Sequence, residues 1–372
     1  MAVYLLSGAL KSASFLLPLT TSFLLMCCIR INGNKLPASF VFGDSLVDSG
    51  NNNYLVSLSK ADCDPNGIDF GGPTGRYTNG RTIADIIGQQ IGLDFLPPYM
   101  APTTTGSVIL KGVNYGSGGG GILNQTGQVY VGRINLDAQI DNFANTRQDI
   151  IRSIGDSAAR QLFSKSLFSV TIGSNDFINN YLLPVVSTAE QKLVPPEQFV
   201  SSMIAKLRPQ LTRLHGLGAR KILVVNVGPI GCIPFQRDIN PNAGDNCASF
   251  PNELAQSYNS KLKTLVDELR TTIPGSNFVY ANVNRIVNDI LQNYASYGFQ
   301  NPNSACCSLG GQHGGLSPCV PSSKVCSDRS KYVFWDAAHP SDATNAIIAK
   351  RLLDGDSNDI SPYNVRHLVS MD

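Results

Sequence analysis

Four short runs rich in Val, Ile and Phe recur along this chain with few polar interruptions. They cover residues 38–42, 166–172, 221–227 and 277–280. Near-continuous apolar runs of this length are typical of strands that are covered on both faces, as in a parallel sheet. The segments between them have helical spacing at residues 82–91, 197–215, 253–269 and 283–294. This alternation predicts an α/β domain with a mostly parallel sheet and helices on both faces.

The length and charge of the chain indicate a large globular domain and limit the kinds of partner it can bind. With 372 residues, 42% of them apolar, it can bury a large core, and no internal repeat or long linker divides it. Its formal net charge is only +2, and three of its basic residues, Lys11, Arg30 and Lys35, lie in an N-terminal stretch that contains no acid. No basic patch argues for a nucleic-acid partner.

The N-terminal segment has the pattern of a targeting signal. Lys11 precedes an apolar run at residues 15–29, which Pro18 interrupts, and a polar stretch follows. Because a membrane-spanning helix needs about 20 apolar residues, this run favours a secretory signal peptide over approximately residues 1–35. An uncleaved anchor is the alternative. The mature protein, residues 36–372, is then expected to be a single domain without a transmembrane segment.

The cysteines agree with export. Outside the signal there are seven, at positions 63, 232, 247, 306, 307, 319 and 326, and the last four crowd into a Gly-, Ser- and Pro-rich loop. Such a loop suggests disulfides, and a zinc knuckle that includes His313 is disfavoured because adjacent cysteines do not fit the usual ligand spacing. We expect Cys232 to pair with Cys247, the last four to pair among themselves, and Cys63 to be the odd thiol. In an exported chain, Asn124 is the glycosylation acceptor.

The stretch FVFGDSLVDSGNNN, residues 40–53, carries a Gly-Asp-Ser directly past the first predicted strand. In α/β folds, sites form at the carboxyl ends of strands, and Ser45 lies just past one. Turn formation alone is the alternative explanation of these residue types. A serine hydroxyl becomes a nucleophile only when a base takes its proton, usually a histidine held by a carboxylate. A catalytic Ser45 therefore needs partners elsewhere in the chain.

Only four histidines are present, and one of them has a suitable acid nearby. In YVFWDAAHPSD, Asp336 lies three residues before His339, so the two side chains can meet and the acid can fix the imidazole tautomer. His215 lies at the end of a predicted helix, His313 in the cysteine loop and His367 in the polar tail. The alternative for Asp336 is a helix cap.

Donors for an oxyanion are predicted at two further strand ends. NYGSGGGG, residues 114–121, offers backbone N–H groups that no side chain obstructs, and TIGSNDF places Asn175 just past a strand. A flexible glycine loop and a helix N-cap are the alternatives. The glycines also match a dinucleotide-binding pattern, but the β-branched residues and glycines that follow do not predict the helix that such a site requires.

Taken in this order, the motifs resemble those of the GDSL esterase/lipase family of the SGNH hydrolases, in its secreted plant branch. The resemblance rests on FVFGDSLVDSGNNN, GRYTNGRTIADII, NYGSGGGGIL, IGSNDFINNY, NVGPIGCIP, the Cys-Cys loop and YVFWDAAHP, and it covers essentially the whole mature chain. It implies a flavodoxin-like, three-layer SGNH hydrolase fold. This chain departs from many relatives at Gly116, where they have alanine before the serine.

The resemblance also implies roles for single residues. Ser45 is the nucleophile, Asp336 and His339 complete a triad, and the oxyanion donors are the N–H of Ser45, Gly118 and Asn175. The implied activity is that of a secreted, extracellular serine esterase or lipase, in the apoplast or cell wall, with no metal or other cofactor. It acts on a small-molecule or lipid ester through an acyl-enzyme, with water or another alcohol as acceptor. A catalytically weak, lectin-like or defence-related binding protein on the same fold is the alternative, and an intact triad argues against it.

Overall fold

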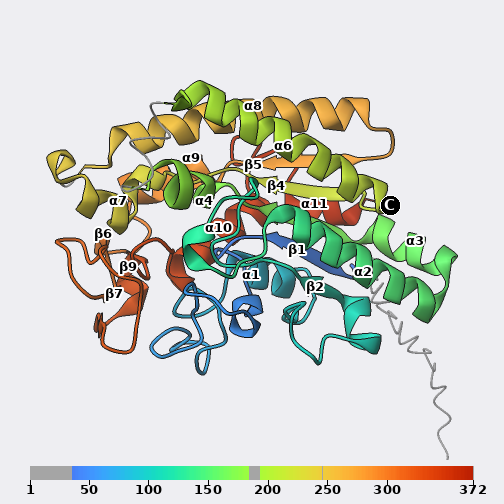
Figure 1. Ribbon diagram of the computed structural model, residues 1–372, viewed down its shortest axis with the longest axis horizontal. Coiled ribbons are helices and arrows are strands. Elements are labelled where there is room, and N and C mark those ends of the chain that lie inside the picture. Colours follow the sequence, from blue (N-terminus) through green and yellow to red (C-terminus); the bar gives the residue numbers. More distant parts are fainter. Residues whose placement is uncertain (1–35, 184–192, 245, 372) are drawn as a thin grey trace, which may run out of the picture. The chain divides into compact units, whose positions relative to one another are not determined.

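The computed structural model describes residues 36–183, 193–244 and 246–371 (Figure 1). The signal peptide expected at residues 1–35 lies outside the described residues. The remainder of the chain forms a contact unit of its own, and its centre is a six-stranded sheet. Within the described ranges, no helix has the length and apolarity needed to cross a membrane.

The sheet is parallel except at one edge. Its strand order is β10-β5-β4-β3-β1-β2, and only the β10–β5 pair is antiparallel. The strands are β1 (Ser39–Gly43), β2 (Gly112–Asn114), β3 (Leu167–Thr171), β4 (Lys221–Val225), β5 (Asn277–Ala281) and β10 (Ile360–Ser361). After β1 the chain forms β2 on one side and then crosses to β3 on the other. The carboxyl end of β1 is therefore the switch point at which parallel α/β sheets form their sites.

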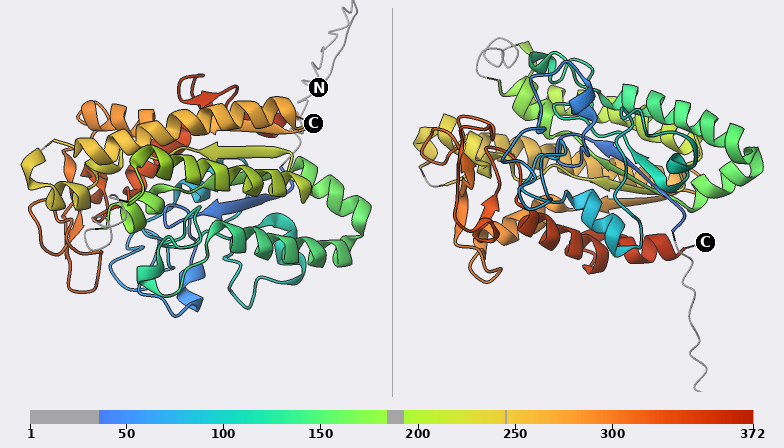
Figure 2. Two further views of the ribbon diagram at one scale, coloured as in Figure 1. Left: turned by 45° about the horizontal axis from the view of Figure 1, so that its top comes forward. Right: turned by 90° about the horizontal axis from the view of Figure 1, so that it is seen from below.

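Helices cover both faces of this sheet, as Figure 2 shows. One layer contains α2 (Leu136–Ile154), α3 (Asp156–Lys165), α6 (Pro196–Gly216) and α8 (Ser249–Thr272). The other contains α1 (Ile83–Gln90), α9 (Val283–Gln292), α10 (Asp342–Asp354) and α11 (Val365–Ser370). The predicted mostly parallel sheet with helices on both faces is confirmed.

Alternation along the strands explains the two cores. In β3, Phe168 and Val170 face the α2–α8 layer, whereas Leu167 faces the α1–α11 layer. Because successive side chains of a strand point to opposite faces, a strand covered on both sides must be apolar at nearly every position. This requirement explains the continuous apolar runs in the sequence, and the strands and helices predicted there begin and end within four residues of the observed bounds.

A small lobe built on disulfides lies beside the sheet. It contains β6 (Asn301–Ala305), β7 (Cys307–Ser308), β8 (Lys324–Val325) and β9 (Tyr332–Phe334), and α7 (Pro234–Ile239) packs against β6. The disulfides join Cys232 to Cys247, Cys306 to Cys326 and Cys307 to Cys319, and Cys63 is a free thiol. These pairings confirm the expected bridges. They also exclude the zinc knuckle, because the four cysteines that would bind the metal are paired in disulfides.

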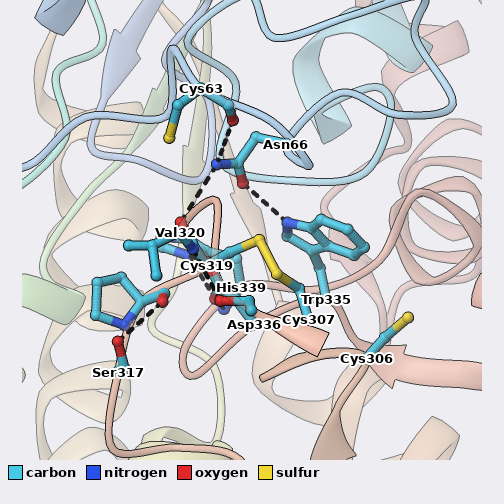
Figure 3. The surroundings of a disulfide bond; sticks show 12 residues. Cys63, Asn66, Cys306, Cys307, Ser317, Cys319, Val320, Trp335, Asp336 and His339 are labelled. Atoms are coloured by element: carbon cyan, nitrogen blue, oxygen red, sulfur yellow. Dashed lines mark hydrogen bonds and ion pairs between the residues drawn. A yellow bond between two sulfur atoms is a disulfide. The ribbon is translucent and has the colours of Figure 1, made fainter. Parts of the chain in front are cut away.

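The lobe is fastened to the segment that carries Asp336. Figure 3 shows the buried Trp335 beside the Cys307–Cys319 bridge, and the Trp335 indole N–H donates to Asn66 Oδ1 over 3.0 Å. The N–H of Cys307 donates to the carbonyl of Trp335 over 2.6 Å. The residue immediately before Asp336 is therefore held by the disulfide lobe on one side and by the loop around Asn66 on the other.

Candidate active site

Ser45 lies in a tight turn that leaves the carboxyl end of β1. The N–H of Asp44 donates to Thr171 O of β3, and the N–H groups of Val47 and Asp48 donate back to Asp44 O. The turn begins at Gly43, where an added Cβ would lie only 2.2 Å from Thr171 O. Only glycine lets the chain turn this close to β3, so the motif's glycine sets the position of the serine.

The structure brings Ser45, His339 and Asp336 together in one hydrogen-bonded line. His339 Nε2 lies 2.7 Å from Ser45 Oγ, and His339 Nδ1 lies 2.8 Å from Asp336 Oδ1 and 2.9 Å from Oδ2. Asp336 and His339 are both largely buried, with side-chain exposures of 5% and 15%. The carboxylate fixes a proton on Nδ1 and leaves Nε2 to accept the serine proton, which is the geometry of an activated nucleophile.

The helix-cap alternative for Asp336 does not agree with the structure. Residues 336–339 form a turn, and Asp336 Oδ1 accepts the N–H groups of Ala338 and His339. The helix α10 begins later, at Asp342, and its N-cap is Ser341, whose side chain accepts the N–H of Thr344. The three-residue spacing thus brings acid and histidine together through a side-chain-capped turn.

Charge and burial shift the pKa values of the histidine and its acid in opposite directions. Burial alone would lower the pKa of His339, but the charge and hydrogen bond of Asp336, with a smaller contribution from Asp44, raise it above its ordinary value. Burial alone would raise the pKa of Asp336, but the charge and hydrogen bond of His339 hold it below its usual range. The acid therefore stays ionised and favours a proton on the histidine.

Asp48, Asn51 and Asn52 connect the nucleophile turn to the glycine loop. Asp48 Oδ1 accepts the N–H groups of Gly50 and Asn51, and its Oδ2 accepts that of Gly118 over 3.1 Å. Asn51 Nδ2 donates to the carbonyls of Asn114 and Gly116, and Asn52 Nδ2 donates to that of Gly118. The run of Asn residues thus satisfies backbone groups that a loop of glycines leaves open.

This network gives an acceptor to the N–H of Gly118, the glycine expected to donate to the oxyanion. Its N–H is directed at the buried Asp48 carboxylate, and an added Cβ would lie 2.1 Å from the Tyr77 hydroxyl. The next residue, Gly119, has a φ of +80° and lines the same cavity as Ser45. Within the described residues, the Gly119 N–H has no acceptor. The N–H of Gly119, rather than that of Gly118, is therefore available to donate to a ligand oxygen beside Ser45.

Asn175 lies in the short helix α4 (Ser174–Asp176) at the carboxyl side of β3. It is not an N-cap, since Gly173 holds that position. Asn175 Nδ2 donates to Gly120 O over 3.0 Å, and its Oδ1 accepts Asn179 Nδ2. The amide is thereby oriented with one N–H bound to the glycine loop, and its second N–H remains available to the cavity that Asn175 and Ser45 share.

Several supporting residues were not anticipated from the sequence. Gln139 of α2 forms a reciprocal pair with Gly43, accepting its N–H over 2.8 Å and donating to its carbonyl over 2.7 Å. Asp176 accepts the N–H groups of Ile122 and Leu123. The sequence did contain one sign of this support. Gln139 lies on the apolar face of α2, between Leu136 and Phe143, and a buried polar side chain needs a hydrogen-bond partner.

Three side chains of the motif GRYTNGRTIADII, residues 75–87, lie in different surroundings. Tyr77 lines the cavity and its ring lies 5.1 Å from that of His339, centre to centre. Arg76 forms a buried bidentate pair with Asp85, and Arg81 bonds Asp342. The two arginines therefore hold α1 and α10 in place, and only the tyrosine reaches the site.

A cavity of about 380 Å³ opens beside the Ser45 hydroxyl. Its wall is mostly apolar and comes from both the sheet and the disulfide lobe, for example from Ile178, Val225, Ile230, Leu316 and Pro318. Apolar pockets with a few convergent polar groups are typical of ligand sites. Within the described residues, no cluster of His, Cys, Asp and Glu side chains has the arrangement of a metal site.

A family model and the most similar proteins that we compared identify the same family. A family model described as "GDSL-like Lipase/Acylhydrolase" matches residues 40–352. The chain is 64% identical to the Arabidopsis thaliana protein "GDSL esterase/lipase At4g16230", over 92% of this chain and 94% of that protein. It is 50% identical to "GDSL esterase/lipase At2g23540" and 43% identical to "GDSL esterase/lipase 7", both from Arabidopsis thaliana. These two matches cover 91% and 90% of this chain, and 89% and 92% of the relatives.

Proposed function

The chain belongs to the GDSL lipase/acylhydrolase family and is a carboxylic ester hydrolase, and we propose that it acts through Ser45, His339 and Asp336 by way of an acyl-enzyme. The observation that carries the proposal is the continuous line from Ser45 Oγ to His339 Nε2 and from His339 Nδ1 to Asp336, with contacts of 2.7 and 2.8 Å.

In the first half-reaction, His339 Nε2 takes the Ser45 proton while Oγ attacks the ester carbonyl carbon. The negative charge that develops on the carbonyl oxygen is received by the N–H groups of Ser45 and Gly119 and by Asn175 Nδ2. His339 then gives its proton to the leaving alcohol, the C–O bond breaks, and the acyl group remains on Ser45. Asp336 stays ionised throughout and stabilises the imidazolium.

In the second half-reaction, a water molecule or another alcohol replaces the departed alcohol. His339 takes a proton from this acceptor, which attacks the acyl carbon, and the same donors stabilise the second tetrahedral intermediate. Return of the proton to Ser45 Oγ releases the acid or the new ester. The apolar wall of the cavity supports esters whose acyl or alkyl part is a hydrocarbon chain.

Rapid-mixing kinetics with p-nitrophenyl butyrate test this proposal. An acyl-enzyme that breaks down slowly predicts a burst of p-nitrophenol equal to the enzyme concentration, followed by steady turnover. Ser45→Ala, which keeps the fold and removes Oγ, should abolish both phases. Folded Ser45→Ala protein that retains wild-type turnover would overturn the assignment of the nucleophile.

We also propose that the protein is exported, through the N-terminal signal, to an extracellular site such as the apoplast or cell wall. The three disulfides support this location, because such bonds persist in oxidising compartments. Asn124 is exposed and is the acceptor for a glycan there. Mass spectrometry of secreted material should find a chain that lacks the first 35 or so residues and carries a glycan at Asn124. A full-length, unglycosylated product would contradict export.

A further inference from the structure

Tyr130 contacts, directly or through one side chain, the two proposed oxyanion donors that lie outside the nucleophile turn. It is partly buried, ends the short 3₁₀ turn Gln128–Tyr130 and lines the active-site cavity. Its hydroxyl is linked to Asn175 through Asn179, and its ring lies against Gly119. It belongs to none of the motifs that predicted the site.

The hydroxyl of Tyr130 begins a chain of hydrogen bonds that ends at the cavity. It donates to Asn179 Oδ1 over 2.9 Å, and Asn179 Nδ2 donates to Asn175 Oδ1. At its other end, Asn175 Nδ2 donates to Gly120 O over 3.0 Å. An amide has its donors at one end and its acceptor at the other, so these two bonds fix the plane of the Asn175 amide and aim its second N–H. The Tyr130 hydroxyl keeps Asn179 in the orientation that supplies one of them.

This hydroxyl keeps its proton around neutral pH. Burial and, to a smaller extent, the charge of Asp336 raise the pKa of Tyr130 above its ordinary value of about 10. Asn179 Oδ1 needs that proton, because the amide nitrogen of the same side chain is directed at Asn175. Phenylalanine at position 130 would remove this donor and keep the ring.

The ring of Tyr130 lies where a side chain at position 119 would be. A Cβ added to Gly119 would lie 2.6 Å from Cδ2 and 3.1 Å from Cε2 of the tyrosine. A Cβ added to Gly127, just before the turn, would lie 2.0 Å from Gly119 O. Gly119 has a φ of +80°, and glycine alone would leave this backbone free to rotate. The packing of residues 127–130 restricts that rotation and with it the direction of the Gly119 N–H.

A strained turn directly after Tyr130 fixes its backbone. Val131 has a φ of +67° and a ψ of −78°, and the N–H of Gly132 donates to Tyr130 O across it over 2.9 Å. These values define the rare γ-turn with a positive central φ, which a β-branched residue strongly disfavours. The same carbonyl accepts the N–H of Leu58 over 3.0 Å, and Val131 pairs with Ser57 in an antiparallel bridge. Strained backbone persists where its surroundings hold it, and it concentrates at functional sites.

We propose that Tyr130 is a positioning residue for ester hydrolysis: its hydroxyl aims the Asn175 amide, and its ring holds the Gly119 N–H, at the place where the oxyanion forms. The inference rests on the proposed function, because it takes Asn175 and Gly119 as the donors. Donors that are already aimed need no reorganisation as the charge develops. The tyrosine should therefore lower the barrier to reaction without strengthening the binding of the substrate.

Tyr130→Phe tests the hydroxyl, with kcat and KM measured on p-nitrophenyl butyrate. We expect kcat to fall about tenfold, less than the roughly 10² to 10³ for loss of a donor, with KM nearly unchanged. Tyr363→Phe is the matched control, since it removes a bond of the same kind outside the cavity wall, from the Tyr363 hydroxyl to Asn277 Oδ1 over 2.9 Å. The control should lose a similar amount of stability and keep wild-type kcat.

Combination with Asn175→Ala shows whether the hydroxyl acts through that amide. Once the amide is gone its orientation no longer matters, so Tyr130→Phe should reduce kcat by less than about twofold in the Asn175→Ala background. Tyr130→Leu also removes the ring beside Gly119 and should still reduce kcat at least about fivefold there. Phenylalanine restores the ring contact, so the two variants separate the hydroxyl from the ring. Melting temperatures establish that each variant is folded.

Three results would overturn the inference. The first is wild-type kcat in Tyr130→Phe while Asn175→Ala loses turnover, which would leave the proposed donor role of Asn175 intact. The second is the same loss from Tyr130→Phe with and without Asn175→Ala, and the third is an equal loss of kcat in Tyr363→Phe. Either of these would assign the effect to general loosening of the fold. Wild-type kcat in Asn175→Ala would instead refute the donor itself, and the inference with it, so the two failures are distinguishable.

Discussion

The two sides of the active site are built differently. On the histidine side, a single turn at residues 336–339 carries both the proposed base, His339, and its acid, Asp336, and both groups titrate. On the oxyanion side, the glycine loop at residues 116–121 carries no titratable group, and buried side chains from distant segments bind its backbone: Asp48, Asn51, Asn52 and Asn175. Proton transfer needs two groups at one place, whereas a preorganised anion site needs many supports. Substitutions on the first side should therefore affect mainly the chemistry, and substitutions on the second should also affect stability.

The largest effect is expected on the histidine side, for Asp336→Asn. Asparagine keeps an oxygen for the N–H groups of Ala338 and His339 but favours the wrong imidazole tautomer. Turnover of p-nitrophenyl butyrate should fall by about 10⁴, with little change in melting temperature. Asp328→Asn, on the exposed surface of the same region, is the matched control. An Asp336→Asn enzyme that keeps wild-type turnover would mean that the acid only shapes the turn.

On the oxyanion side, Asn175→Ala should reduce kcat by roughly 10² to 10³ and leave KM nearly unchanged. Because Asn175 also binds Gly120 O, we expect some loss of stability, unlike for Asp336→Asn. Asn180→Ala in the same segment is the control, since it removes a bond to Thr126 outside the cavity and should leave kcat intact. Equal kcat losses in the two variants would show that loosening of the loop, and not a missing donor, causes the effect.

Gln139→Leu tests the hydrogen bonds that hold Gly43, without removing a group that contacts the substrate. Leucine fits the apolar face of α2 but leaves the N–H of Gly43 without a partner, at a cost of about 1–3 kcal/mol for that buried group, whereas the Gly43 carbonyl keeps the N–H of Ser117. Urea denaturation should show this loss, and kcat should fall about tenfold through displacement of Ser45. The exposed Gln148→Leu on the same helix should change neither quantity. Unchanged stability in Gln139→Leu would refute the assigned role.

The smallest expected effect is a shift in the pH dependence of activity, which His339 causes. Only neutral His339 can accept the serine proton, and its pKa is raised, so activity should fall on acidification at a pH above the ordinary histidine value of about 6.5. The contribution of His339 to the free energy of unfolding should increase on acidification, whereas activity decreases. The folded state holds the His339 proton more tightly, so this contribution is complete below about pH 6.5 and is lost as pH rises through the folded pKa.

Rate profiles and melting curves recorded over the same pH range check both signs. An acid limb that lies below the ordinary histidine value would contradict the assigned coupling between His339 and Asp336. So would a stability contribution that grows as the pH rises through this range.

The same contrast between the two sides explains what the sequence could predict. Ser45, Asp336 and His339 could be proposed from the sequence because each belongs to a short motif and because only four histidines compete for the role of base. The four main parallel strands were found because burial on both faces leaves an unmistakable apolar run. Both kinds of signal are local, so a single chain segment contains them.

The parts that were missed depend on contacts between distant segments. Within a run of four glycines, nothing local tells which N–H is taken by Asp48, and the choice between Gly118 and Gly119 therefore needed the structure. The support of Gly43 by Gln139 spans 96 positions. The strand β10 has only two residues, too few to show a period. These features follow from tertiary packing, which a motif does not encode.

The central claim, that His339 activates Ser45 as the nucleophile, is tested most directly by covalent labelling with a fluorophosphonate ester followed by peptide mapping. An activated serine is phosphonylated selectively, whereas ordinary loop serines are not. We expect one adduct, on Ser45, that forms at least a hundredfold more slowly in Asp336→Asn and is absent in Ser45→Ala. An adduct on another serine, or none in protein shown to be folded, would contradict the account.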